Sequence, residues 1–122
     1  MNCIFCKIIN GDIPCYKLYE DETVICFLDV NPKANGHTLV IPKEHTLDIT
    51  TIDNDVLLHI FNVAKDMAKL LEEKLNITGY TLAQNNGAPQ EVKHIHLHII
   101  PTYDNETNIE NVEDIYKKIK SN

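Results

Sequence analysis

Three histidines alternate with aliphatic residues in the stretch His94-Ile95-His96-Leu97-His98-Ile99-Ile100-Pro101. Successive side chains of a β-strand point to opposite faces, so the pattern predicts a strand over 94–100 with three imidazoles on one face. A helix would scatter the same positions around its axis and leave no apolar stripe. An ordinary solvent-facing strand usually mixes Thr, Lys and Glu, whereas half of the chain's six histidines lie here. The pattern therefore favours a functional site on this strand.

The composition indicates one globular domain. A chain of 122 residues can bury a single core, and we expect one domain over 1–122. The hydrophobic fraction of 43% and the charged fraction of 24% are ordinary for a soluble protein. A net charge of −7 argues against nonspecific binding to nucleic acid or an anionic membrane, but not against a pocket for a small anion. No apolar run approaches the ~20 residues of a membrane span, and the N-terminus is too short and polar for a signal peptide, so we expect a cytoplasmic protein.

The hydrophobic periodicity predicts several strands and one long helix. Between residues 56 and 75 the apolar positions recur every three or four residues, with charged residues between them, which is typical of an amphipathic helix. The nearly continuous apolar run from Val24 to Leu28 suggests a central strand. We expect strands over 16–20, 23–29, 37–42, 80–84 and 94–100, a short helix over 7–10 and a possible last helix over 109–120.

Cys3 and Cys6 have the spacing Cys-x-x-Cys, which lets two thiolates hold one metal ion from a tight turn. By itself this is half of a zinc site, and His45 is a candidate third ligand. The rival interpretation is thioredoxin-like redox chemistry, but that motif lies between a strand and a helix rather than at residue three. Disulfides are not expected in a reducing compartment, and Cys15 and Cys26 fit no partner pattern.

Other residues have both a functional and a structural interpretation. Asp29 ends a strand, where its carboxylate can reach a ligand hydroxyl or simply complete a turn. Phe5 and Ile8 lie three apart and share a face, either in the core or as one wall of a pocket. The polar loop 85–90 suits an anion, or it is an ordinary hairpin connection. His37 alone is an ordinary surface histidine.

The pattern from His94 to Ile100 resembles the signature of the histidine triad family of nucleotide hydrolases and transferases. The similarity covers about residues 3–101, and the nearest branch looks like the bacterial histidine triad nucleotide-binding proteins. It implies an α+β fold with an antiparallel sheet of about five strands, one long helix and short terminal helices. It also implies a homodimer. The other segments that carry the resemblance are Ile4-Phe5-Cys6-Lys7-Ile8-Ile9, Phe27-Leu28-Asp29, Gly36-His37-Thr38-Leu39-Val40-Ile41-Pro42-Lys43, Asn85-Asn86-Gly87 and Gln90.

The resemblance implies roles for the residues that match the family motifs. His96 would attack the α-phosphorus of a purine nucleotide (AMP, GMP or a derivative) and form a nucleotidyl-histidine. His98 would contact the phosphate and assist the leaving group. His37 would support the relay of histidine side chains behind His96. The remaining implied contacts are Phe5, Ile8, Phe27 and Leu39 with the purine, Asp29 with the ribose hydroxyls, and Asn85 and Gln90 with the phosphate or the leaving group.

The resemblance also implies a zinc site. Some bacterial members, and the related galactose-1-phosphate uridylyltransferases, bind zinc through residues that correspond here to Cys3, Cys6, His45 and His94. A Cys₂His₂ set is a closed tetrahedral set, which is typical of a structural rather than a catalytic zinc.

The chemistry of the proposed reaction is reasonable for these residue types. A neutral imidazole can attack phosphorus, provided that its second nitrogen is held as a donor by a backbone carbonyl or another histidine. Hydrogen bonds can stabilise the phosphoryl oxygens, so no catalytic metal is required.

Several functions remain open from the sequence. The first is hydrolysis of AMP linked to an amine, with dinucleoside polyphosphate hydrolysis as the alternative reaction. The second is a nucleotide-binding or interaction protein with little turnover. The third is a metalloenzyme that uses His94, His96 and His98 together. The loop before His94 is shorter than is usual in the family, and Glu91 replaces a serine of some members, so the leaving group is also open.

Overall fold

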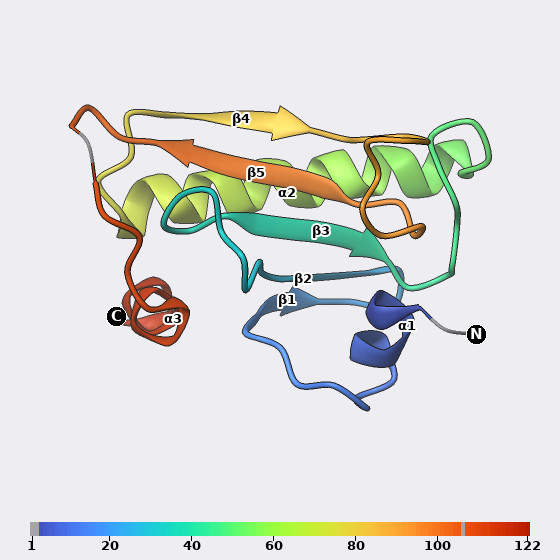
Figure 1. Ribbon diagram of the computed structural model, residues 1–122, viewed down its shortest axis with the longest axis horizontal. Helices are drawn as coiled ribbons and strands as arrows, with labels where there is room; N and C mark the ends of the chain where they lie inside the picture. The colour runs from blue at the N-terminus through green and yellow to red at the C-terminus, as the bar shows by residue number, and fades with distance from the viewer. Residues whose placement is uncertain (1–2, 106) are drawn as a thin grey trace.

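The computed structural model describes residues 3–105 and 107–122, and its centre is a five-stranded antiparallel sheet (Figure 1). The strand order is β1-β2-β3-β5-β4, and every neighbouring pair is antiparallel. This architecture confirms the expected α+β fold. The elements are α1 (Ile4–Ile9), β1 (Lys17–Glu20), β2 (Val24–Leu28), β3 (Thr38–Pro42), α2 (Asn54–Lys74), β4 (Gly79–Ala83), β5 (Leu97–Thr102) and α3 (Val112–Lys120).

Both faces of the middle of the sheet are covered, and this explains the continuous apolar run in β2. All five residues of β2 and all five of β3 are buried. Val24, Cys26 and Val40 belong to the larger core under α2 and α3, whereas Phe27 and Leu39 belong to a smaller cluster under α1. The alternation of a strand thus divides one apolar run between two layers.

The long helix α2 packs on β3 and β5 and supports the sheet from one side (Figure 1). It spans Asn54–Lys74, close to the expected 56–75, and its buried side chains follow the predicted periodicity. His59 of α2 is partly exposed, and its Nε2 donates to Asp21 Oδ2 at 2.7 Å. This contact ties α2 to the turn between β1 and β2.

The histidine stretch differs from the expected strand in where the strand begins. Strand β5 starts at Leu97, so His94 and His96 precede it and only His98 lies in it. The chain is still held to a neighbour there, because the Ile95 N–H donates to the Thr46 carbonyl at 2.8 Å. Ile95 and Leu97 join the larger core, and His96 contacts Phe5 on the α1 side, so the predicted division into two faces is correct.

The two terminal helices also differ from their expected bounds. Helix α1 begins at Ile4 rather than Lys7, because the Cys3 Sγ accepts the Cys6 N–H at 3.4 Å and caps its first turn. Helix α3 begins at Val112 rather than at 109, after Asn111, whose side chain accepts the Glu113 N–H at 2.8 Å. In the part of the chain that the structure describes, no helix has the length and apolar character needed to cross a membrane.

Candidate functional site: the histidine cluster and its pockets

Strand register brings predicted site residues together on the α1 side of the sheet. Phe27 of β2 pairs with Leu39 of β3, and Leu39 pairs with His98 of β5. Opposite residues of antiparallel strands project to the same face, so these three side chains form a row. Beside the row, the Asp29 N–H donates to the His37 carbonyl at 2.9 Å, which places those two residues next to each other. Segments far apart in the chain therefore meet at one site.

The His96 ring has one nitrogen fixed and the other available. Its Nδ1 lies 2.8 Å from the carbonyl oxygen of His94, and because a carbonyl can only accept, Nδ1 carries the proton. The neutral ring therefore has its lone pair on Nε2. Phe5 packs edge to face against this ring, with centroids 5.0 Å apart, and His96 is only 4% exposed. The ring is held in one orientation with a nucleophilic nitrogen.

His37 and His98 form a second fixed pair. The Lys33 N–H donates to His37 Nδ1 at 3.1 Å, so the proton of neutral His37 is on Nε2. This Nε2 lies 2.9 Å from His98 Nδ1 and donates to it, which leaves the proton of neutral His98 on Nε2. Asp29 Oδ2 is 3.7 Å from His37 Nε2, close enough to favour positive charge there but too far for a good hydrogen bond. A chain of donors thus runs from a backbone amide to His98.

Burial lowers the pKa values of His37 and His98, which keeps these two rings neutral near pH 7. Burial is the main cause that lowers the pKa of His98 from 6.5 to about 4, and the neighbouring His96 and His37 lower it further. Burial also lowers the pKa of His37, although Asp29 opposes this shift. At neutral pH, His98 therefore presents an N–H to the pocket rather than a full positive charge.

We expect the free energy of unfolding to fall as the pH drops from about 6.5 towards 4. Unfolded His98 takes up a proton near pH 6.5, whereas folded His98 resists protonation until about pH 4, so protons favour the unfolded chain in this window. The loss from this group is at most about 3 kcal/mol and is complete below pH 4. Urea unfolding across this range measures it in the wild type and in His98→Asn, which should lose less stability. Equal losses in the two proteins would contradict the assignment.

Two pockets meet at His96 and His98. The first has a volume of about 250 Å³ and is mainly apolar, and it opens beside α1 and the end of β2. The second has a volume of about 160 Å³ and is lined mainly by polar and charged side chains, among them Asn85, Lys33 and Glu91. The predicted contact residues in the first pocket are Phe5, Ile8, Phe27, Asp29, Leu39, His96 and His98.

Gln90 is placed differently from its expected role. It lies outside both pockets and is 2% exposed, and its Nε2 donates to the Leu47 carbonyl at 2.7 Å. Its Oε1 is buried without a hydrogen-bond partner among the described residues. Gln90 therefore holds the 85–94 loop against the segment after His45 in this structure.

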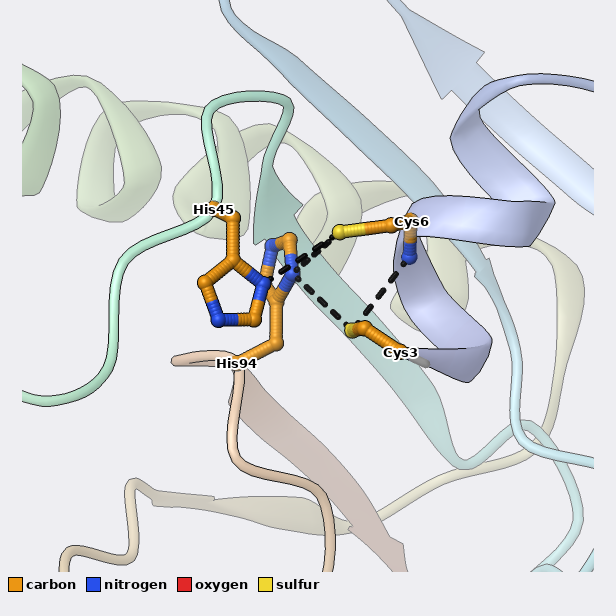
Figure 2. A group of neighbouring side chains, drawn as sticks. All are labelled: Cys3, Cys6, His45 and His94. Atoms are coloured by element: carbon orange, nitrogen blue, oxygen red, sulfur yellow. Dashed lines mark hydrogen bonds between the residues drawn. The ribbon is translucent and has the colours of Figure 1, made fainter. Parts of the chain in front are cut away.

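The four predicted metal ligands converge between α1, the loop after β3 and the segment before β5 (Figure 2). Their ligand atoms all lie within 4.8 Å of one another. Cys3 Sγ is 3.5 Å and Cys6 Sγ 3.6 Å from His94 Nδ1, and Cys6 Sγ is 3.3 Å from His45 Nδ1. Tetrahedral zinc with typical bond lengths separates a sulfur and a nitrogen ligand by about 3.5 Å. The donor set therefore fits one zinc ion.

The His94 ring is prepared for this role. Its Nε2 lies 2.8 Å from the Pro42 carbonyl, so Nε2 carries the proton and Nδ1 faces the two sulfurs with its lone pair. His96 Nδ1 is hydrogen-bonded to the His94 carbonyl oxygen, and His98 Nδ1 is hydrogen-bonded to His37 Nε2. These two nitrogens therefore face partners other than a metal ion. The structure thus does not gather His94, His96 and His98 around one point, as a three-histidine metal site would need.

Several residues that line the first pocket have no functional signal in the sequence. Ile13, Pro14 and Cys15 line the first pocket from the turn after α1, and Val92 lines it from the 85–94 loop. Their local pattern is that of an ordinary turn and loop. Only the packing of distant segments brings them to the site.

Comparisons with known proteins agree with this geometry. A family model described as "HIT domain" matches residues 10–105. The chain is 49% identical over 104 residues to an uncharacterized HIT-like protein of Methanocaldococcus jannaschii, a match that covers 84% of this chain and 80% of that protein. It is 44% identical over 114 residues to the adenosine 5'-monophosphoramidase HNT1 of Candida albicans, which covers 88% of this chain and 75% of that one.

A solved structure is similar over nearly the whole chain. The zinc-bound histidine triad family protein of Mycobacterium smegmatis matches with a TM-score of 0.91 at 35% sequence identity, covering 98% of this chain and 91% of that chain. The family model, the sequence relatives and the fold therefore agree, and the chain belongs to the histidine triad (HIT domain) family.

Proposed function

We propose that this protein is a nucleotide hydrolase or transferase that cleaves the bond between a nucleoside 5'-phosphoryl group and its leaving group. The observation that carries the proposal is the His96 ring, whose Nδ1–H is held by the His94 carbonyl so that Nε2 remains a nucleophile where two pockets meet. Attack of Nε2 on the α-phosphorus forms a nucleotidyl-histidine. The similar Candida albicans protein is named for an activity on adenosine 5'-monophosphoramidate.

The first pocket suits the nucleoside. Its apolar side chains Phe5, Ile8, Phe27 and Leu39 form walls for a purine, and Asp29 at the end of β2 can accept hydrogen bonds from ribose hydroxyls. The polar second pocket, with Asn85, suits the phosphate and the leaving group. The Gln90 side chain has no part in this proposal, because its amide donates to the Leu47 carbonyl.

The two steps use the fixed protons of the histidines. As the His96–phosphorus bond forms, the bond to the leaving amine breaks. The amine takes the Nε2 proton of His98 while water returns a proton to that nitrogen, so the His98 ring stays neutral. His37 Nε2–H stabilises His98 through the hydrogen bond at 2.9 Å. In the second step a water attacks phosphorus and releases a proton to solvent, and the His96–phosphorus bond breaks to release the nucleoside monophosphate.

Turnover of matched substrates tests this proposal and its alternatives. We expect faster hydrolysis of AMP linked to an amine than of diadenosine polyphosphates, with purine substrates preferred to pyrimidine ones. Faster polyphosphate hydrolysis would establish the alternative reaction instead. Tight AMP binding without turnover of either substrate would contradict the enzyme and favour a nucleotide-binding protein.

We also propose a structural zinc ion held by Cys3, Cys6, His45 and His94. The donor geometry supports it, and the similar Mycobacterium smegmatis protein is zinc-bound. The ion would join α1 to the segment that carries His96. Thiolate ligands need reducing conditions, which fits the cytoplasmic location expected from the sequence.

A homodimer is the third part of the proposal. Strand β4 is an edge of the sheet, and its side chains Tyr80 and Leu82 are 42% and 43% exposed. On α2, Leu58 is 62% and Phe61 43% exposed. Apolar side chains on an open edge strand favour pairing with a second copy. Sedimentation equilibrium should give twice the chain mass, and Leu82→Lys should shift the protein towards monomer. A monomeric wild type at micromolar concentration would contradict the dimer.

A further inference from the structure

The loop between β2 and β3 carries two groups of the proposed site, and it is held from outside by the C-terminal part of the chain. Asn35 lies in this loop and is only 4% exposed. Its Nδ2 donates to the Asn108 carbonyl at 3.0 Å, and its Oδ1 accepts the Glu110 N–H at 2.8 Å. The Tyr103 hydroxyl donates to the Asn35 carbonyl at 2.6 Å. Three hydrogen bonds thus tie one buried residue to the region after β5.

The same loop determines which ring nitrogen carries the proton in the histidine relay, which is the hydrogen-bonded pair of His37 and His98. The Lys33 N–H donates to His37 Nδ1 at 3.1 Å, and the His37 N–H donates to the Ala34 carbonyl at 3.1 Å. In sequence, Asn35 lies between Ala34 and His37, within the turn that makes these contacts. Any movement of the turn at Asn35 would therefore change the distance between the Lys33 amide and the His37 ring.

The loop backbone is tightly packed at Gly36. This residue has φ of 91°, and a Cβ there would be 2.7 Å from Leu75 Cδ1, so the backbone passes directly over the end of α2. Two cavities lie where the loop meets Glu110 and Ile115: one of about 10 Å³, and a larger one of about 410 Å³ that Asn35 and Tyr103 also line. The C-terminal region is thus in direct contact with the back of the proposed site.

We propose that Asn35 is a positioning residue that couples the C-terminal region to the histidine relay. By fixing the 33–37 turn, Asn35 keeps the Lys33 N–H on His37 Nδ1, and this selects the His37 tautomer that donates to His98. The proposed effect on turnover rests on the function proposed above, whereas the effect on the His37 tautomer does not require catalysis.

Two variants and one matched control test this role in the full-length protein with its metal site loaded. Asn35→Ala removes both side-chain hydrogen bonds, and Tyr103→Phe removes only the hydroxyl that binds the Asn35 carbonyl. Tyr116→Phe is the control, because its hydroxyl also donates to a backbone carbonyl, that of Lys17 at 3.0 Å. Long-range ¹H–¹⁵N NMR of the histidine rings reports which nitrogen carries the proton.

We expect the wild type and Tyr116→Phe to show the Nε2–H tautomer at His37, and the two test variants to show a mixture of tautomers. The resonances of His45 and His94 at the metal site should stay in place. In turnover, kcat should fall about tenfold in Asn35→Ala and less in Tyr103→Phe, with KM for the nucleotide within about twofold, because the relay acts in the chemical step.

The outcomes separate this inference from the proposed function. An unchanged His37 tautomer in both variants would overturn the positioning role, and so would a raised KM with an unchanged kcat. If Asn35→Ala does not fold, the NMR result for Tyr103→Phe decides. If the wild type turns over no nucleotide substrate, the proposed function is wrong, and the NMR result alone decides the inference.

Discussion

The variant His96→Ala is expected to lose nucleotidyl transfer almost completely. We expect kcat/KM on an adenosine phosphoramidate to fall by at least about 10⁴-fold, which corresponds to about 5.5 kcal/mol of transition-state stabilisation. The reason is that no other described nitrogen at the pocket junction has the fixed Nδ1–H and free Nε2 of His96. Steady-state kinetics with purified variants measures the loss.

The control for this prediction is another histidine outside the site. His59 lies on α2, on the face of the sheet opposite to the site, and donates to Asp21. His59→Ala should therefore change kcat/KM by no more than about twofold. Thermal unfolding should show that both variants are folded. If His96→Ala retains a tenth or more of the wild-type activity, His96 is not the nucleophile.

Removal of the metal ligands is expected to have the largest effect on stability. The double variant Cys3→Ser/Cys6→Ser should lose the one zinc ion per chain that we expect in the wild type. Its melting temperature should fall by about 10 °C or more, because metal binding to the folded chain contributes directly to folding free energy. Elemental analysis and calorimetry measure the two effects, and a strong chelator should produce the same shift in the wild type.

A matched cysteine controls for the substitution itself. Cys15 is half-buried and lies apart from the cluster of Cys3, Cys6, His45 and His94, so Cys15→Ser should keep the zinc content of the wild type. A wild-type protein that is purified without zinc, and whose melting temperature does not respond to added zinc or chelator, would contradict the metal site.

Much of the fold could be predicted because its signals are local. The apolar run of β2 and the three- and four-residue spacing of α2 are written in consecutive residues, and both elements were found within one or two residues of their bounds. The prediction of two faces for the histidine stretch is also correct, because the side chains of residues 94–96 continue to alternate before β5 begins. The start of α1 was wrong because it depends on a sulfur cap at Cys3 that the propensity of residues 4–6 does not reveal.

The site could be predicted only as a set of residues and not as an arrangement. Resemblance supplied the metal ligands and the histidines, but the tautomer of each ring depends on carbonyl and amide partners elsewhere, such as Pro42 for His94 and Lys33 for His37. The place of Gln90 in a motif implies a phosphate contact, whereas its hydrogen bond to the Leu47 carbonyl arises only in the folded chain. Asn35 gave no signal, because its partners are about 70 residues away in sequence.

Capture of the covalent intermediate tests the central proposal most directly. Protein mixed with an adenosine phosphoramidate should be quenched under denaturing alkaline conditions at times spanning a single turnover, and its intact mass should be measured. We expect a transient species heavier by one adenylyl group, with peptide mapping locating that group on His96 and no such species in His96→Ala. Turnover without any adenylylated protein, or an adenylyl group on a different side chain, would contradict the account.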